Sequence, residues 1–184
     1  MTGKKGVDPN VQTAAVSSEA GEAPDLEQLV RDHWAPTYRV VMALVRDHAL
    51  AEDITQETLL KAWKALPSFR GDASLRNWVL RIAHNTAISV LRRRKPEPRE
   101  PWNLPESISG RDSSDLVIDE LMLQQFQTAL SAMPASTRAI VVLREVEGRS
   151  YEEIADIVRL PLSTVRTRLF RARKELAIAL KGWR

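Results

Sequence analysis

Residues 150–176 read SYEEIADIVRLPLSTVRTRLFRARKEL, and this stretch decides how the C-terminal part of the chain folds. Ser150 and Glu153 have the spacing of a capping box, which predicts that a helix begins at this point. Ala155 is small enough to let a second helix cross closely, and Pro161 suits the first turn of that second helix. The spacing therefore predicts a helix-turn-helix.

The second of these helices carries a basic outer face. Arg166, Phe170 and Arg173 recur at spacings of four and three, so they share one side of the helix. Arginine can bind guanine edges or phosphates, which favours duplex DNA as the ligand, although a solvated amphipathic helix would show the same pattern. Arg159 stands where the turn of this motif usually has glycine, and a left-handed conformation there would cost roughly 1 kcal/mol. We therefore expect that the turn is irregular or that the strain at Arg159 is absorbed.

The rest of the chain also has a helical pattern. Apolar residues recur at helical spacing from Leu26 to Val45, from about Leu50 to Leu66 and from about Ser74 to Arg93, and no stretch alternates for long enough to be a strand. We expect an all-α protein of two small helical domains joined by a flexible linker, with the helix-turn-helix in the second. The expected division is a disordered tail at 1–24, a first domain at 25–95, a linker at 96–114 and a second domain at 115–184.

Composition narrows the classes of function. The 184 residues include no cysteine, which excludes disulfide scaffolds, thiolate metal sites and cysteine nucleophiles. The three histidines lack the spacing of metal ligands, and no apolar run is long enough to cross a membrane, so we expect no metal, no cofactor and no membrane insertion. The net charge is only +3, but residues 70–95 carry seven Lys or Arg against one acid, and residues 161–184 do the same. Two basic blocks predict two separate contacts with a polyanion.

Four motifs resemble, in the right order, those of one bacterial family. DITQE at 53–57, followed by Trp63, resembles the D-x-x-Q-E…W signature of the extracytoplasmic-function (ECF, group four) sigma factors, which are promoter-specificity subunits of RNA polymerase. FRGDASLRNWVLRIAHN at 69–85 resembles the stretch that follows in their region 2. GRSYEEIA at 148–155 and TVRTRLFRAR at 164–173 resemble their region 4.

The resemblance implies a protein that catalyses nothing itself. It would bind core RNA polymerase, recognise the −35 and −10 promoter elements and stabilise melted DNA. Its docking helix would contact the β′ clamp helices through Asp53, Gln56, Glu57 and Leu60. That stretch is acidic, which suits a basic partner helix, although a solvated acidic face would look alike. Further partners that the resemblance implies are the β flap of the polymerase and an anti-sigma factor, and the expected location is the cytoplasm, at the nucleoid during initiation.

The same resemblance implies two sets of DNA contacts. The second domain would read the −35 element, with Arg168 and Arg173 on phosphates. The first domain would capture unpaired bases of the −10 element, and Trp78 there is more readily explained by core packing than by base stacking. The residues implied at the −35 element are Arg166, Thr167, Arg168, Phe170, Arg171 and Arg173. The residues implied at the −10 element are Arg70, Gly71, Ser74, Asn77, Trp78, Arg81 and Asn85.

Two other hypotheses stay open at this point. A stand-alone DNA-binding regulator would use the same helix-turn-helix without docking on polymerase. A hydrolase could use the carboxylates of Asp53 and Glu57, one helical turn apart, but the chain offers no nucleophile motif, phosphate loop or HExxH to complete such a site. We expect packing roles, and no cofactor contacts, for Trp34, Trp63 and Trp183.

Overall fold

The computed structural model describes residues 25–93 and 125–181, and the first of these ranges forms a three-helix domain. Helix α1 spans Leu26–Val45, α2 spans His48–Ala65, the 3₁₀ turn η1 spans Leu66–Ser68 and α3 spans Leu75–Arg93. Aspartates begin the first two helices: Asp25 accepts a hydrogen bond from the amide of Gln28 at 2.7 Å, and Asp47 accepts one from Leu50 at 2.9 Å.

The second range forms a compact set of shorter helices. Residues 125–132 are helical, α5 spans Ala135–Val141 and runs into the π-helical turn η2 at Val142–Val146, α6 spans Tyr151–Val158, and α7 spans Leu162–Ala179. Helices α6 and α7 are the predicted helix-turn-helix. Their facing sides bury Ile154, Val158, Val165 and Leu169.

The predicted all-α class with two helical domains is confirmed, and the described residues contain no strand. The predicted tail at 1–24 and linker at 96–114 lie outside the described residues, and the exact domain limits remain predictions. Among the residues described, no helix combines the length and the apolar character that a membrane span requires.

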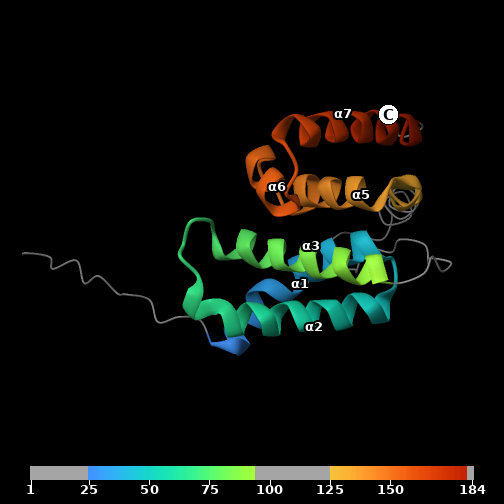
Figure 1. Cartoon of the computed structure of the whole chain (residues 1–184). Coiled ribbons are helices and arrows are strands. Elements are labelled where there is room, and N and C mark those ends of the chain that lie inside the picture. The colour runs from blue at the N-terminus through green and yellow to red at the C-terminus, as the bar shows by residue number, and fades with distance from the viewer. Residues whose placement is uncertain (1–24, 94–124, 182–184) are drawn as a thin grey trace, which may run out of the picture.

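The two domains pack directly against each other. Helix α1 contacts α5, and α3 contacts α6, while α7 lies on the far side of α5 (Figure 1). One apolar core runs through both domains, from Val40 and Leu44 of α1 to Leu130, Ile140 and Leu143. A shared core of this kind removes apolar surface of both domains from water and stabilises their contact.

Candidate nucleic-acid interface

The turn between α6 and α7 has regular geometry in spite of its arginine. The Ser150 hydroxyl accepts a hydrogen bond from the amide of Glu153 at 3.1 Å, and the Glu153 carboxylate accepts one from the amide of Ser150 at 2.6 Å, so the predicted capping box is confirmed. Arg159 ends α6 with φ 54° and ψ 50°, a left-handed conformation. The turn is therefore regular, and Arg159 adopts the left-handed conformation in which glycine is usual.

The outer face of α7 is exposed, as the −35 assignment requires. Arg166, Thr167 and Arg171 point to solvent, and Phe170 is 72% exposed, which is unusual for an aromatic side chain. Arg166 makes a long contact of 3.7 Å with Glu152, and both of these side chains remain mostly exposed. An exposed ion pair of this kind contributes little stability, so it would yield readily to a ligand.

Two other arginines of α7 are engaged within the domain. Arg168 donates a hydrogen bond to the Ser136 hydroxyl at 3.0 Å and is half-buried. Arg173 donates to the carboxylate of Glu145 at 2.9 Å and to the hydroxyl of Tyr151 at 3.1 Å. The hydrogen bond to Glu145 is the main reason why the pKa of Arg173 is raised. A phosphate contact by Arg173 would therefore compete with an existing carboxylate partner.

The loop between η1 and α3 presents the first of the residues implied at the −10 element. Arg70, Gly71 and Ser74 are exposed, and Gly71 has φ +76°, which a residue with a Cβ rarely adopts. The Ser74 hydroxyl accepts a hydrogen bond from the amide of Asn77 at 3.3 Å, close to the start of α3. The loop thus has a defined backbone with polar side chains open to solvent.

Trp78 lies beneath this loop. Its ring centroid is 5.1 Å from that of Phe69, with the ring planes tilted by 46°, and the side chain packs against the small core cluster of Leu29, Leu59 and Val79. It is only partly buried. Core packing therefore explains most of its position, and its ring also contacts that of Phe69, at the start of the loop.

Asn77 and Arg81 both contact α6 of the second domain, which the sequence did not predict. The side chain of Asn77 is buried, and its amide donates a hydrogen bond to Glu153 of α6 at 2.6 Å. Arg81 points to Asp156, also on α6, at 3.3 Å. Of the residues implied along α3, only Asn85 is exposed. The helix that would meet single-stranded DNA is thus partly covered by the other domain.

The predicted docking face of α2 is continuous and exposed. Asp53, Gln56, Glu57 and Leu60 all lie on the solvent side of the helix, and 46% of the Leu60 surface is accessible. The expectation that Trp63 packs in the interior is wrong, since it is 43% exposed. The sequence spacing was ambiguous, because Trp63 follows the exposed Leu60 by three residues and the buried Leu59 by four.

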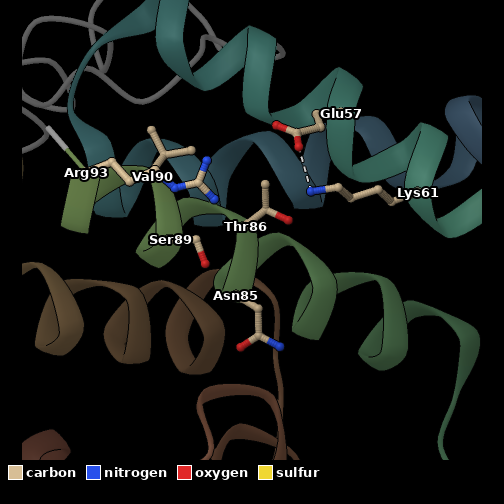
Figure 2. A pocket seen from close by; sticks show the side chains of 7 residues that line it. All are labelled: Glu57, Lys61, Asn85, Thr86, Ser89, Val90 and Arg93. Atoms are coloured by element: carbon tan, nitrogen blue, oxygen red, sulfur yellow. Dashed lines mark ion pairs between the residues drawn. The ribbon is translucent and has the colours of Figure 1, made fainter.

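A shallow groove joins this docking face to α3. It has a volume of about 260 Å³ and is lined by Glu57 and Lys61 of α2 and by residues of α3 that include Asn85 and Arg93 (Figure 2). Glu57 and Lys61 form an ion pair within α2 at one side of the groove. The groove brings a residue assigned to polymerase docking next to one assigned to DNA, so the two predicted interfaces are adjacent.

Comparison with known families accounts for both domains. Residues 29–97 match the sequence model described as Sigma-70 region 2, and residues 123–176 match the model described as Sigma-70, region 4. Region 2 precedes region 4 along the chain, in the same order as the four motifs in the sequence.

Relatives match over two thirds or more of the chain. The RNA polymerase sigma-H factor of Pseudomonas aeruginosa is 33% identical over 174 residues, which cover 89% of this chain and 90% of the relative. The ECF RNA polymerase sigma-E factor of Escherichia coli is 38% identical over 136 residues, covering 67% and 70%. Among solved structures, the sigma factor RpoE in complex with the anti-sigma factor NepR from Bartonella quintana is 28% identical, with a TM-score of 0.71, and the alignment covers 87% of this chain and 99% of that one.

Proposed function

Because this chain belongs to the sigma-70 family of RNA polymerase sigma factors and is of the ECF type, we propose that it acts as a group four sigma factor with the contacts described below. A sigma factor directs promoter-specific transcription initiation, and this chain does so as a member of the family. The proposal concerns which residues dock on the polymerase and which meet DNA. We also propose that the chain itself catalyses no reaction and that it acts in the cytoplasm, where transcription occurs.

The observation that carries the proposal is the exposed face of α2. Its two carboxylates, Asp53 and Glu57, are followed along the same side of the helix by an apolar pair, Leu60 and Trp63, all open to solvent. An exposed surface that combines apolar and charged side chains has the composition of a specific protein contact. We assign this face, with Gln56, to the β′ clamp helices of the core enzyme, and we assign the β flap to the second domain.

The DNA contacts follow from the two basic surfaces. In the proposal, duplex at the −35 element meets the α7 face with Arg166, Thr167, Phe170 and Arg171, because these side chains are exposed on one side. Unpaired bases of the −10 element meet the loop with Arg70 and the start of α3. The domain limits of 25–95 and 115–184 are part of the same proposal. An anti-sigma factor is a further proposed partner, supported by the complex in which the Bartonella quintana relative was solved.

Run-off transcription tests the function directly. Purified core polymerase is combined with this chain and a promoter library, and we expect a subset of promoters to depend on the added chain. A double variant, Asp53→Ala with Glu57→Ala, should weaken binding to core polymerase by about tenfold or more. The matched control is Glu27→Gln, which removes one exposed carboxylate from α1, away from the docking face. If the double variant binds polymerase like the parent while duplex binding is tight without polymerase, the chain is a stand-alone regulator.

A further inference from the structure

We propose that Arg173 is a positioning residue of the DNA-reading helix: together with Glu145 and Tyr151 it fixes the rotation of α7, in place of the phosphate contact expected from the sequence. Glu145 lies in the π-helical turn η2, and Tyr151 is the first residue of α6, so one side chain joins three elements of the second domain. The reading of duplex DNA by α7 rests on the proposed function. The internal role of Arg173 rests on its contacts.

Each nitrogen of the Arg173 guanidinium already has a partner inside the domain. Nε donates a hydrogen bond to the Glu145 carboxylate at 2.9 Å, Nη2 lies 2.8 Å from the same oxygen, and Nη1 donates to the Tyr151 hydroxyl at 3.1 Å. The Arg173 and Glu145 side chains are 47% and 38% exposed, and an isolated pair of this kind would contribute little. A cation shared by a carboxylate and a hydroxyl is instead part of a network, so a phosphate could replace Glu145 only if several contacts broke together.

The two partners of this arginine are themselves held in place. The guanidinium carbon of Arg144 lies 5.0 Å from the centroid of the Tyr151 ring, and Arg144 also donates to the carbonyl oxygen of Arg149 at 2.7 Å. Glu145 belongs to the hydrogen-bonded turn of Val142–Val146 and not to a free loop. Both partners therefore provide fixed points for the C-terminal half of α7.

The apolar contacts of α7 leave its rotation to other groups. Its buried residues form a single row at spacings of four, three and four: Val165, Leu169, Ala172 and Leu176. Because apolar burial is non-directional, such a row resists separation of the helix more than a small rotation about its axis. Helical periodicity places Arg173 and Arg168 on opposite sides of this row. Arg168 donates to the Ser136 hydroxyl at 3.0 Å, so polar contacts hold the helix on both sides.

A small rotation of α7 would matter for reading bases, because Arg166 and Phe170 lie on the same side of the helix as Arg173. Side chains extend about 5–6 Å from the helix axis, so a rotation of about 20° moves their ends by about 2 Å. Donor–acceptor distances of hydrogen bonds vary over only about 0.5 Å. Phosphate contacts carry no sequence information, so loss of the Arg173 contacts should affect discrimination between sequences more than attachment to the DNA backbone.

Discrimination between duplex sequences is the first measurement. A duplex library with randomised positions is selected on the parent chain, and discrimination is the ratio of affinities for the selected duplex and a scrambled one. Glu145→Ala makes the chain more basic, yet it should lower discrimination about fivefold to tenfold. The exchanged pair Glu145→Arg with Arg173→Glu should restore most of it, which a phosphate contact at position 173 would not survive. The matched control, Glu175→Ala, removes an exposed carboxylate from α7 and should leave discrimination unchanged.

The salt dependence of binding to a non-specific duplex of mixed sequence is the second measurement. If Arg173 were a phosphate contact restrained by Glu145, Glu145→Ala would free it and steepen the slope of log affinity against log salt by about 1. A positioning residue should leave the slope within about 0.3 of the parental value. Tyr151→Phe keeps the ring and the charge, and it should lower discrimination about threefold with an unchanged slope.

The outcomes decide between the two roles of Arg173. A steeper slope for Glu145→Ala, or parental discrimination in both Glu145→Ala and Tyr151→Phe, would overturn the positioning role. Circular dichroism checks that each variant is folded, and Tyr151→Phe supplies the test if Glu145→Ala is not. A parent that enriches no sequence would reject the −35 reading in the proposed function, and the salt slope would still decide whether Arg173 is held within the domain.

Discussion

Arg138 of α5 donates a hydrogen bond from Nε to the carbonyl oxygen of Ala43 in α1, although 95 residues separate them in the chain. The arginine is 1% exposed, and its Nη1 also donates to the carbonyl oxygens of Leu130 and Met133 at 3.1 and 3.0 Å. A single buried cation thus satisfies carbonyl groups from both domains. We therefore expect substitution of Arg138 to lower the free energy of unfolding more than substitution at most other positions.

Arg138→Met should lower the free energy of unfolding by about 3 kcal/mol, because buried carbonyl oxygens lose a charged donor. Methionine keeps much of the length of the side chain, so the loss reports hydrogen bonding more than volume. Urea denaturation measures the change. Arg138→Lys is the matched control. Its free energy of unfolding should lie between those of the parent and the methionine variant, since lysine retains a charge but not the planar set of donors. A methionine variant within about 0.5 kcal/mol of the parent would contradict these hydrogen bonds.

Arg159→Gly should raise the stability of the second domain by about 1 kcal/mol, because glycine adopts the left-handed conformation of this turn without steric cost. Arg159→Ala removes the same charge and side chain but keeps the Cβ, so it should leave the thermal midpoint nearly unchanged. Equal midpoints for the glycine and alanine variants would mean that the turn carries no strain.

Glu153 should make the stability of the protein depend on pH in the acid range. Hydrogen bonds from the backbone of Ser150, then from Asn77, hold the pKa of this carboxyl below its usual 4.5. A depressed folded pKa means that the stabilisation is complete above the unfolded value and is lost as the pH falls through the folded value. The free energy of unfolding of the parent should therefore fall toward that of Glu153→Gln between about pH 6 and pH 3.

The glutamine variant is the control for this titration, because it carries no charge and its single amide oxygen can still accept the capping hydrogen bond from the Ser150 amide. Urea denaturation at a series of pH values gives the difference between the two proteins. A difference that stays constant over the acid range would contradict the assigned pKa direction.

Binding of non-specific duplex DNA should fall with salt. If about six phosphates are neutralised, the slope of log affinity against log salt should be roughly −5. Arg171→Ala, on the exposed face of α7, should reduce the magnitude of that slope by about 1. Arg173→Ala should change it less, because Arg173 is already paired with Glu145. Lys64→Ala, on α2, is the control that removes a cation elsewhere. Equal slopes for the Arg171 variant and the parent would show that Arg171 does not contact the phosphates of the DNA.

Much of the local structure could be predicted from the sequence. The limits of α1 and α3 agree with the expected helices to within one residue, and the Ser150–Glu153 capping box forms as expected. These features depend on residues three or four positions apart, whose contacts are set by the helix itself. The exposed face of α2 with Asp53 and Glu57 followed from the same periodicity.

The hydrophobic periodicity was misleading at an apolar residue that is exposed on the surface. Trp63 was expected inside the domain, and it is exposed next to Leu60. Hydrophobic character alone cannot distinguish a core position from the centre of a binding face, because both exclude water, one within the chain and the other in a complex.

The amino-acid order by itself determined the helices, their caps and the basic and acidic faces, because each depends on neighbours within one or two helical turns. Only the tertiary structure decided that Asn77 meets Glu153, and that Arg39 meets Glu147 across 108 positions of sequence. Those pairings arise from how two surfaces dock, and no spacing within either segment encodes the docking. The contact between α3 and α6 therefore belongs to the tertiary structure and not to either segment alone.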